Sequence, residues 1–245
     1  MATNYLQWHH NGKLDPEEWL LAGFLGDGNW TGFTLKELER GKVRVGRDDF
    51  VAGGIQVMRC AMRQLGIEYS HCDYPEPLRP FLHRRVWTDR LGRLMDRVDR
   101  EELDSPVFVK PKEKLKRFTG FVLGGREDFY RSNWAGRGTE VWCSEPVRFV
   151  SEFRCPVIGG EVYGAYLYDA EGPFHREPDM GAVREMAAAW EGPKGYCLDV
   201  GVLSDGRTAL VEVNDGFSVG CYGMPAETYW KMLSLRWEEL KLGCK

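Results

Sequence analysis

The sequence feature that most constrains the fold is the stretch CLDVGVLSDGRTALVEVN, residues 197–214. Two apolar runs flank Asp205-Gly206, and runs rich in valine and leucine are typical of buried strands. An Asp-Gly pair between such runs favours a two-residue type I′ turn, because both residues accept a positive φ there. The stretch therefore predicts an antiparallel β-hairpin, so the fold must include an antiparallel sheet.

A two-residue turn would fix the register of this hairpin. Leu203 would face Thr208 and Asp199 would face Glu212, so two carboxyl groups would project to one face with their Cβ atoms about 5 Å apart. Like charges in that position destabilise a sheet, and a shared proton or a divalent cation would compensate. Asn214 lies two residues after Glu212 on the same face and adds a neutral oxygen. Since Mg²⁺ prefers oxygen ligands together with substrate phosphates, the hairpin predicts a Mg²⁺-nucleotide site.

Two other interpretations of the hairpin stay open on the sequence alone. In the first, the ribbon is exposed and its acids point into water, as is common on antiparallel strands. In the second, a three-residue loop with a bulge shifts the pairing by one residue and places Asp199 and Glu212 on different faces of the sheet.

The first part of the chain, residues 1–104, has the pattern of a small α/β unit. Strands are expected at Asn4–Trp8 and Lys42–Gly46, and apolar residues at helical spacing predict a helix over Phe50–Leu65. A second helical pattern lies in the arginine-rich stretch Leu78–Arg100, whose arginines are expected mainly on a solvated helix face.

The second part, residues 105–245, is richer in strands and predicts an α+β domain built on antiparallel pairing. Helices are expected near Gly181–Trp190 and Ala226–Leu240. The strands expected in this part are VFV, FTGFVLGG, TEVWCSEPV, VRFVSEFRCPVIGGEVYGAYLY, YCLDVGVL and TALVEVN. The chain therefore predicts two domains, with a boundary between residues 104 and 105.

Composition limits the compartment and the partners. The formal net charge of −4 and the pI near 5.8 give no general attraction to nucleic acids or anionic membranes, although local basic patches are not excluded. The seven cysteines are odd in number and form no CxxC pair, which suits a reducing cytoplasm better than a disulfide framework. No stretch has the roughly 20 apolar residues of a membrane helix, so we expect neither membrane spanning nor secretion.

Candidate phosphate ligands lie at the start of the second part. The chain contains no GxxxxGK[ST] motif, and GFLGDGNWTG lacks the lysine that such a loop requires. Lys110 instead ends the apolar strand VFV, and Pro111 then turns the chain. Shortly afterwards, KRFTGFVLGG places Lys116 and Thr119 on a turn that can fold over phosphates.

A further charged pair lies on the strand VRFVSEFRCPV. Glu152 and Arg154 share one face of this strand, because Phe153 between them points to the other face. The two side chains can form an ordinary ion pair. Alternatively, the guanidinium of Arg154 can clamp a transferring phosphoryl group or a developing oxyanion.

Taken in order, these motifs resemble the ATP-grasp superfamily. The resemblance covers roughly Val107 to Gly223 and comprises the VFVKP strand, the linker strand VWCSEPV, the E-F-R strand before GGEV, and the terminal D…E-x-N set. More narrowly, DYPEPLRPFLHRRVW, FVKPKEKLKRFTGFVL and LVEVNDGFSVGCYG are similar to the small ATP-grasp clade named for two arginines and a lysine. This narrower match extends back to about Asp73.

The resemblance implies a fold and a set of roles. The fold is α+β, with two subdomains that grip ATP, preceded by a small α/β pre-ATP-grasp domain. The resemblance places phosphate contacts at Lys110 and Lys116, adenine contacts at the backbone near Ser144 to Val147, and ribose contacts at Glu145 or Glu152. Thr119, on the same loop as Lys116, is a further candidate for nucleotide binding. It gives catalytic roles to Arg154, Lys110 and Arg84, and Mg²⁺ ligation to Asp199, Glu212 and Asn214.

The resemblance also implies a reaction. A carboxylate attacks the γ-phosphate of Mg-ATP to give an acyl phosphate and ADP, and an amine then displaces phosphate. The expected substrates are small-molecule or peptide carboxylates and amines. A phosphotransferase acting on a hydroxyl and a non-catalytic nucleotide-binding module are the two alternatives. Two departures from larger family members are the short phosphate loop KRFTGFVLGG and the strand GAYLYD, which has no basic residue.

Overall fold

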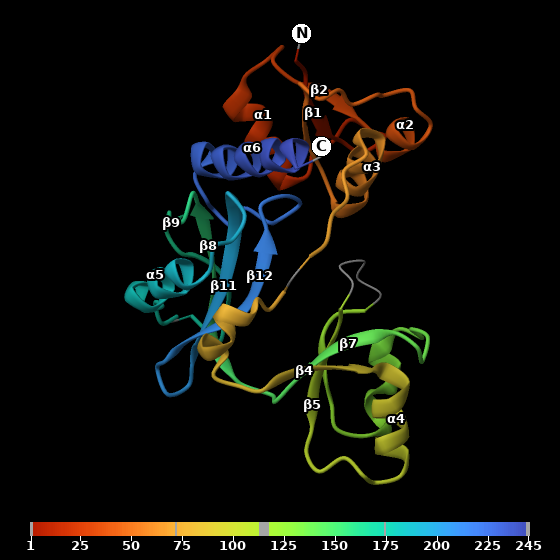
Figure 1. Ribbon diagram of the computed structural model, residues 1–245, viewed down its shortest axis with the longest axis vertical. Coiled ribbons are helices and arrows are strands. Elements are labelled where there is room, and N and C mark those ends of the chain that lie inside the picture. The colour runs from red at the N-terminus through yellow and green to blue at the C-terminus, as the bar shows by residue number, and fades with distance from the viewer. Residues whose placement is uncertain (1, 72, 113–117, 174, 244–245) are drawn as a thin grey trace. The chain divides into compact units, whose positions relative to one another are not determined.

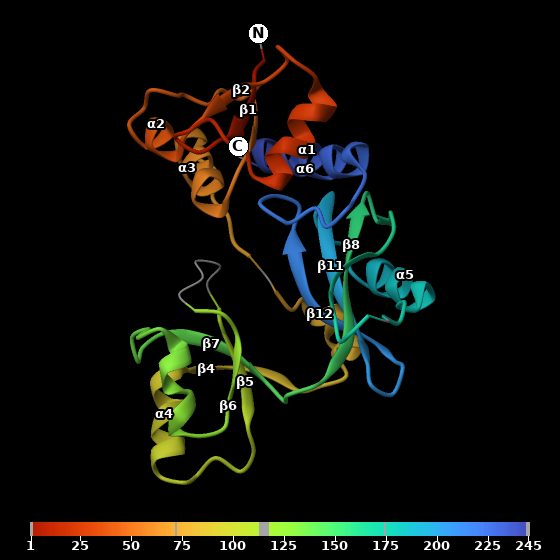
Figure 2. The same ribbon diagram turned by 180° about the vertical axis from the view of Figure 1, so that it is seen from behind.

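The computed structural model describes residues 2–71, 73–112, 118–173 and 175–243 (Figures 1 and 2). Packing divides the chain into a larger unit, with residues up to Phe81 and from Phe149 onward, and a smaller unit, Leu82–Arg148. This division groups residues by their contacts. The domain boundary expected between residues 104 and 105 is a different kind of division and stays a prediction.

The larger unit begins with a three-stranded parallel sheet. Its strand order is β2 (Thr31–Phe33), β1 (Asn4–Gln7), β3 (Phe50–Ala52), and the strands are connected through α1 (Pro16–Leu25) and α2 (Leu35–Glu39). A capping box starts α2, because Thr34 accepts from the Glu37 amide while Glu37 accepts from the Thr34 amide. The strand expected at the N-terminus is thus confirmed at Asn4–Gln7.

Two expectations for this region are wrong in detail. The helix expected from Phe50 begins only at α3 (Ile55–Leu65), because Phe50–Ala52 pairs with β1 as a strand. Residues 42–46 form no strand. The valines of KVRVG belong to the apolar core that also contains side chains of α3. Their backbone is bonded by Gln64 of that helix instead of by a neighbouring strand, because its side chain accepts from the Val45 amide at 3.0 Å and donates to the Val43 carbonyl at 3.3 Å.

A second, antiparallel sheet forms the other half of the larger unit. Its main path runs β10 (Tyr166–Ala170), β8 (Phe149–Ile158), β11 (Gly195–Leu203), β12 (Thr208–Asp215), and β9 (Glu161–Val162) pairs with β8. The flanking helices are α5 (Met180–Ala189) and α6 (Ala226–Leu242), close to the two helices expected from the sequence. All nine residues of β11 are buried, so this strand lies at the centre of the core.

Helix α6 joins the two sheets of the larger unit. It lies beside α1 in both views (Figures 1 and 2) and also contacts β3, β8 and β11. Trp237 of α6 is 1% exposed, and its indole N–H donates to the Asp49 carbonyl at 2.8 Å. Leu6 of β1 and Cys197 of β11 belong to one continuous apolar core with the α6 side chains. The N-terminal residues therefore pack as part of the larger unit.

The smaller unit is a four-stranded antiparallel sheet covered by a helix. The strand order is β4 (Val86–Arg90), β7 (Glu140–Ser144), β5 (Val107–Pro111), β6 (Phe121–Leu123). Helix α4 (Leu91–Asp99) confirms the helical pattern in the second half of the arginine-rich stretch, and it buries Leu91 and Leu94 against Val109 and Val141. Short 3₁₀ segments occur at Glu76–Leu82 and Arg126–Ser132.

Candidate functional site

The β11–β12 hairpin has a different turn from the one expected. Leu203 N donates to the Arg207 carbonyl at 2.8 Å, and Gly206 has a φ of 91°, so the loop contains three residues, Ser204 to Gly206. Asp205 is not among the residues with a positive φ, whereas a type I′ turn needs one at both central positions. Its carboxylate instead accepts from the Arg207 amide at 3.0 Å. The predicted two-residue turn is therefore wrong.

A bulge restores the predicted carboxylate pair. Near the turn the register is shifted by one residue, with Val200 opposite Leu210, but between Val200 and Asp199 the pairing shifts again. Val211 is the extra residue of this bulge, and Asp199 lies opposite Glu212, as the sequence predicted. The two irregularities compensate each other, so the acids stay paired across the two strands.

Arg154 extends the acidic pair into a row of three charged side chains across β8, β11 and β12. The register places Arg154 opposite Asp199 on one side and Glu212 opposite Asp199 on the other. Arg154 Nε and Nη2 donate to Asp199 Oδ1 and Oδ2 at 2.8 and 2.7 Å, which is a bidentate pair. Arg154 is 8% exposed and Asp199 is 2% exposed, so this ion pair is removed from water.

Asn214 links the two carboxylates. Its Nδ2 donates to Asp199 Oδ2 at 2.8 Å and to Glu212 Oε1 at 3.1 Å, so three side chains converge at one point. Rotating the carboxamide would point its oxygen to the same place. A carboxylate oxygen has two lone pairs, so an oxygen of Asp199 that accepts from Arg154 could also coordinate a cation once the carboxamide of Asn214 is rotated. Two carboxylates and an amide oxygen around one point fit Mg²⁺, provided that water and phosphate oxygens complete its shell.

No cluster of three His, Cys, Asp or Glu side chains that could hold a metal occurs among the described residues. A magnesium ion in this place would therefore depend on the amide of Asn214 and on ligands from outside the protein. That number of protein ligands is typical of Mg²⁺ bound together with a nucleotide, since the ion keeps several waters and takes phosphate oxygens.

The Arg154 guanidinium is held from several sides. Its Nη1 donates to the Gly220 carbonyl at 3.1 Å, and its centre lies 4.9 Å from the ring of Tyr222 and 5.7 Å from the ring of Tyr168. Burial opposes the charge of Arg154, but the hydrogen bonds and negative charge of Asp199 outweigh it and raise the pKa of the guanidinium. Arg154 is therefore a fixed cation.

Glu152 lies on the same face of β8 as Arg154. The Tyr168 hydroxyl donates to Glu152 Oε2 at 2.7 Å. Burial raises the pKa of the Glu152 carboxyl, and the hydrogen bond from Tyr168 only partly opposes this shift. Tyr168 and Tyr222 were not predicted as site residues. An aromatic residue on a strand or in a glycine-rich loop carries no sequence signal that separates a site residue from a core residue.

The other predicted site residues that the structure describes lie in the smaller unit. Lys110 is half-buried on β5 opposite Trp142, and the Arg84 Nη1 donates to the Leu82 carbonyl at 3.1 Å. Glu145 is exposed and pairs through its backbone and its carboxylate with the backbone of Arg85. The remaining three are buried Ser144, half-buried Val147 and exposed Thr119. Lys116 lies outside the described residues, and the roles of this whole group stay predictions.

Comparison with known protein families identifies the chain. Residues 81–232 match the model of an ATP-grasp domain, that of family 2 in the clade named for two arginines and a lysine, and this is more than half of the chain. The protein therefore belongs to the ATP-grasp superfamily. Within the superfamily it belongs to family 2 of that clade, which agrees with the resemblance drawn from the motifs.

Solved structures agree with this fold. D-alanine–D-alanine ligase from Bacillus anthracis, solved with ATP, superimposes with a TM-score of 0.58 at 14% identity over 99% of this chain and 98% of that chain. The ATP-grasp ligase PsnB with its minimal precursor gives 0.53 at 14% identity over 96% and 100%. The macrocyclase MdnC from Microcystis aeruginosa MRC, bound to the precursor peptide MdnA, gives 0.50 at 11% identity over 98% and 99%. A comparison with curated proteins finds no match.

None of the helices in the described ranges is both long and apolar enough to cross a lipid bilayer.

Proposed function

We propose that the protein is an ATP- and Mg²⁺-dependent carboxylate–amine ligase that forms an acyl phosphate and releases ADP and phosphate. The observation that carries the proposal is the row of Arg154, Asp199 and Glu212 across three neighbouring strands, with Asn214 bridging the two acids. Membership of the ATP-grasp superfamily supports the same proposal. The similar structures include a D-alanine–D-alanine ligase, a ligase bound to its minimal precursor and a macrocyclase bound to a precursor peptide, so we propose a small molecule or a peptide as substrate.

In this proposal, the acids and the arginine of the row have separate tasks. Asp199, Glu212 and Asn214 hold Mg²⁺, which neutralises charge on the ATP phosphates when it is bound. Arg154 stabilises the negative charge on the transferring phosphoryl group, and its contacts with Asp199 and Gly220 hold it in place before the reaction starts. Lys110 and Lys116 are proposed to contact phosphates, Thr119 is proposed to bind the nucleotide, and Arg84 is proposed as a further catalytic residue.

The proposed reaction needs no nucleophile from the protein. A substrate carboxylate oxygen attacks the γ-phosphorus, and the bond from this phosphorus to the ADP oxygen breaks. The amine nitrogen then attacks the acyl carbon, and the carbon–oxygen bond to phosphate breaks. We propose that the backbone near Ser144 to Val147 contacts adenine and that Glu145 or Glu152 contacts the ribose.

The test is an ADP-release screen with the whole chain. Amino acids, dicarboxylic acids and short peptides are supplied with Mg-ATP, each with and without an added amine. We expect ADP release that depends on the carboxylate, and we expect Glu212→Gln to lower it by about 10² to 10³-fold because one electrostatic partner is lost. Glu161→Gln is the matched control, since Glu161 is an exposed acid on β9 of the same sheet.

Three results would contradict the proposal. Full activity in the Glu212→Gln variant would remove the metal site from the mechanism. A stable phosphorylated product that accumulates without any amine would instead identify a phosphotransferase, and nucleotide binding without turnover would identify a binding module.

A further inference from the structure

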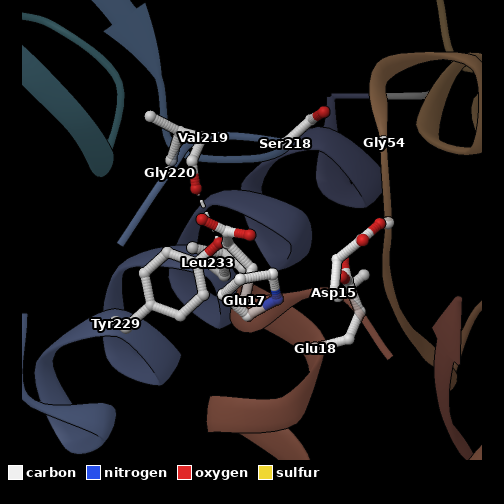
Figure 3. Close-up of a pocket in the computed structure, with 12 residues that line it drawn as sticks. Asp15, Glu17, Glu18, Gly54, Ser218, Val219, Gly220, Tyr229 and Leu233 are labelled. Carbon is white, nitrogen blue, oxygen red and sulfur yellow. Dashed lines mark hydrogen bonds between the residues drawn. The ribbon is translucent and has the colours of Figure 1, made fainter. Parts of the chain in front are cut away.

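A pocket of about 330 Å³ lies within the larger unit, outside the Arg154 row (Figure 3). One part of its wall comes from the start of α1 and the residue before it, with Asp15, Glu17 and Glu18. Other parts come from Gly53-Gly54 before α3, from the loop after β12, and from Tyr229 and Leu233 of α6. This volume is at the small end of the range for ligand sites, so it suits a compact molecule or the end of a chain.

Glu18 is the unusual member of this wall. Acids in the first turn of a helix are ordinary, because they complement the helix dipole from an exposed position. Glu18, however, is 7% exposed, and among the described residues no other residue makes a hydrogen bond or an ion pair with its carboxyl group. A buried carboxyl group without a partner in another residue costs stability, so the dipole alone does not explain it.

The neighbouring acids are placed differently. Glu17 Oε1 accepts from the Cys221 amide at 3.2 Å and so ties α1 to the loop after β12. Asp15 Oδ1 lies 3.1 Å from Nε2 of exposed His9. Glu18 is therefore the acid of the wall that is left to interact with a molecule in the pocket.

The charge of the wall selects the kind of ligand. Three of the twelve lining residues are acidic and none is lysine, arginine or histidine. A carboxylate or a phosphate would be repelled by Asp15 and Glu17, whereas an ammonium group would be attracted by all three acids. A protonated amine would also give the Glu18 carboxylate the partner that it lacks.

The pocket is connected to the Arg154 row through Gly220. This residue lines the pocket, and its carbonyl accepts from Arg154 Nη1 at 3.1 Å. The backbone of Gly220 is close to the side chains of Tyr222 and Arg154, since a Cβ on Gly220 would lie 2.8 Å from the Tyr222 ring and 3.3 Å from Arg154 Nη1. A molecule in the pocket would therefore lie next to the loop that positions the proposed phosphoryl clamp.

We infer that this acidic pocket binds the amine substrate of the ligation, as a compact primary amine, and that Glu18 accepts its proton. The inference rests on the proposed ligase function. The ammonium gives one proton to the Glu18 carboxylate, which frees the nitrogen lone pair. This pair forms the carbon–nitrogen bond to the acyl phosphate, the bond from the acyl carbon to the phosphate oxygen breaks, and the second nitrogen proton leaves with the phosphate.

The environment of Glu18 suits a proton acceptor near neutral pH. Burial raises the pKa of its carboxyl group to about 7, and the neighbouring charges of Glu17 and Asp15 add to the shift. His9 opposes the shift, as does the hydrogen bond from the backbone of Glu18 itself. From α6, the ionisable group that faces Glu18 is the phenol of Tyr229, which donates to the Val219 carbonyl at 2.7 Å. A base with a pKa close to the working pH transfers protons most effectively.

The first test is direct binding without ATP, by ligand-observed saturation-transfer NMR on the whole chain. The panel contains the standard L-amino acids, D-alanine, ethanolamine and putrescine, with acetate and succinate as carboxylates that lack an amine. We expect at least one amine to bind, and we expect Glu18→Gln to weaken it about tenfold or more, because a charged hydrogen bond is lost. Glu17→Gln should weaken it less, since its amide oxygen can still accept from Cys221.

The control is Glu227→Gln, which removes an exposed acid from the first turn of α6. Melting temperatures of all variants establish that they are folded. A panel in which no amine depends on Glu18, or in which only acetate and succinate bind, overturns the inference.

The second test separates this inference from the proposed function. Hydroxylamine is uncharged at neutral pH and traps acyl phosphates without help from a base, so Glu18→Gln should keep hydroxylamine-dependent ADP release. The same variant should form amide from the protonated amine about 10² to 10⁴-fold more slowly, and it should lose the fall in rate that the parent shows below about pH 7. Equal losses with both acceptors overturn the role of Glu18. If neither the parent nor the Glu18→Gln variant releases ADP with any substrate, the ligase proposal fails. The binding experiment then still decides whether the pocket holds an amine.

Discussion

The burial of Glu18 leads to a stability prediction that needs no knowledge of the substrate. We expect Glu18→Gln to raise the free energy of unfolding at about pH 8 and to leave it nearly unchanged at about pH 4. The glutamine side chain has nearly the same shape and is neutral at every pH, whereas the buried carboxyl group must ionise in place as the pH rises. The variant therefore isolates the cost of that ionisation.

The sign and the size follow from the pKa. The ordinary value of the carboxyl group is 4.5, and burial raises the pKa of Glu18 in the folded protein to about 7. Below pH 4.5 the group is neutral in both states and costs nothing. Between these two values the unfolded chain loses the proton while the folded protein keeps it, so the free energy of unfolding falls as the pH rises. At about 1.4 kcal/mol for each pH unit, the full cost above pH 7 is about 3 kcal/mol.

Urea unfolding of the parent and the variant, measured from about pH 4 to about pH 8, tests this prediction. The difference between the two should grow from near zero to about 3 kcal/mol, which corresponds to roughly 6–12 °C in melting temperature for a chain of this size. Glu227→Gln should show no such trend. A difference that stays constant across the pH range, or a parent more stable than Glu18→Gln at about pH 8, would refute the reasoning.

Two further predictions concern the core of the larger unit. Asp199→Ala should lower the free energy of unfolding by about 3–5 kcal/mol, because it leaves the buried Arg154 guanidinium without its carboxylate. Glu212→Gln should lower it far less, since Glu212 is only half-buried. Urea unfolding compares the two variants, and equal losses would contradict the burial argument. Gly195→Ala should cost about 1–3 kcal/mol, because its Cβ would lie 2.3 Å from the Met232 carbonyl oxygen of α6. Gly136→Ala, whose Cβ meets nothing within 4 Å, should leave the melting temperature unchanged.

The hairpin shows how far local sequence rules reach. The apolar runs and the Asp-Gly pair predicted two antiparallel strands, and both are present. Turn chemistry favoured two loop residues, but the loop has three, because Asp205 stabilises it through its side chain rather than through a positive φ. The bulge at Val211 has no marker in the sequence, since it depends on how β11 and β12 pair along their whole length. The pairing of Asp199 with Glu212 was therefore predicted correctly with an incorrect register near the turn.

The pocket shows what the sequence conceals. Asp15, Glu17 and Glu18 surround a proline at the start of a helix, and that pattern is typical of an ordinary helix N-terminus. Only tertiary packing separates exposed acids from a buried one. Tyr229 and Gly220, which complete the pocket with Glu18, are more than 200 positions away in the sequence, so no local rule connects them.

Packing alone does not explain two features of the larger unit, and both involve the loop that contains Gly220. One is Glu18, which is buried and has no partner in another of the described residues, and the other is the Arg154–Asp199 ion pair between β8 and the fully buried strand β11. Apolar side chains of similar volume in place of a buried ion pair are often neutral or stabilising, so packing alone gives little reason for an arginine and an aspartate there. Arg154 donates to the Gly220 carbonyl, and Glu18 lies in the pocket that Gly220 lines. Because ionisable groups with raised pKa values and costly burial gather at functional sites, their meeting at one loop supports a single reaction centre, with a phosphoryl clamp on one side of Gly220 and an amine site on the other.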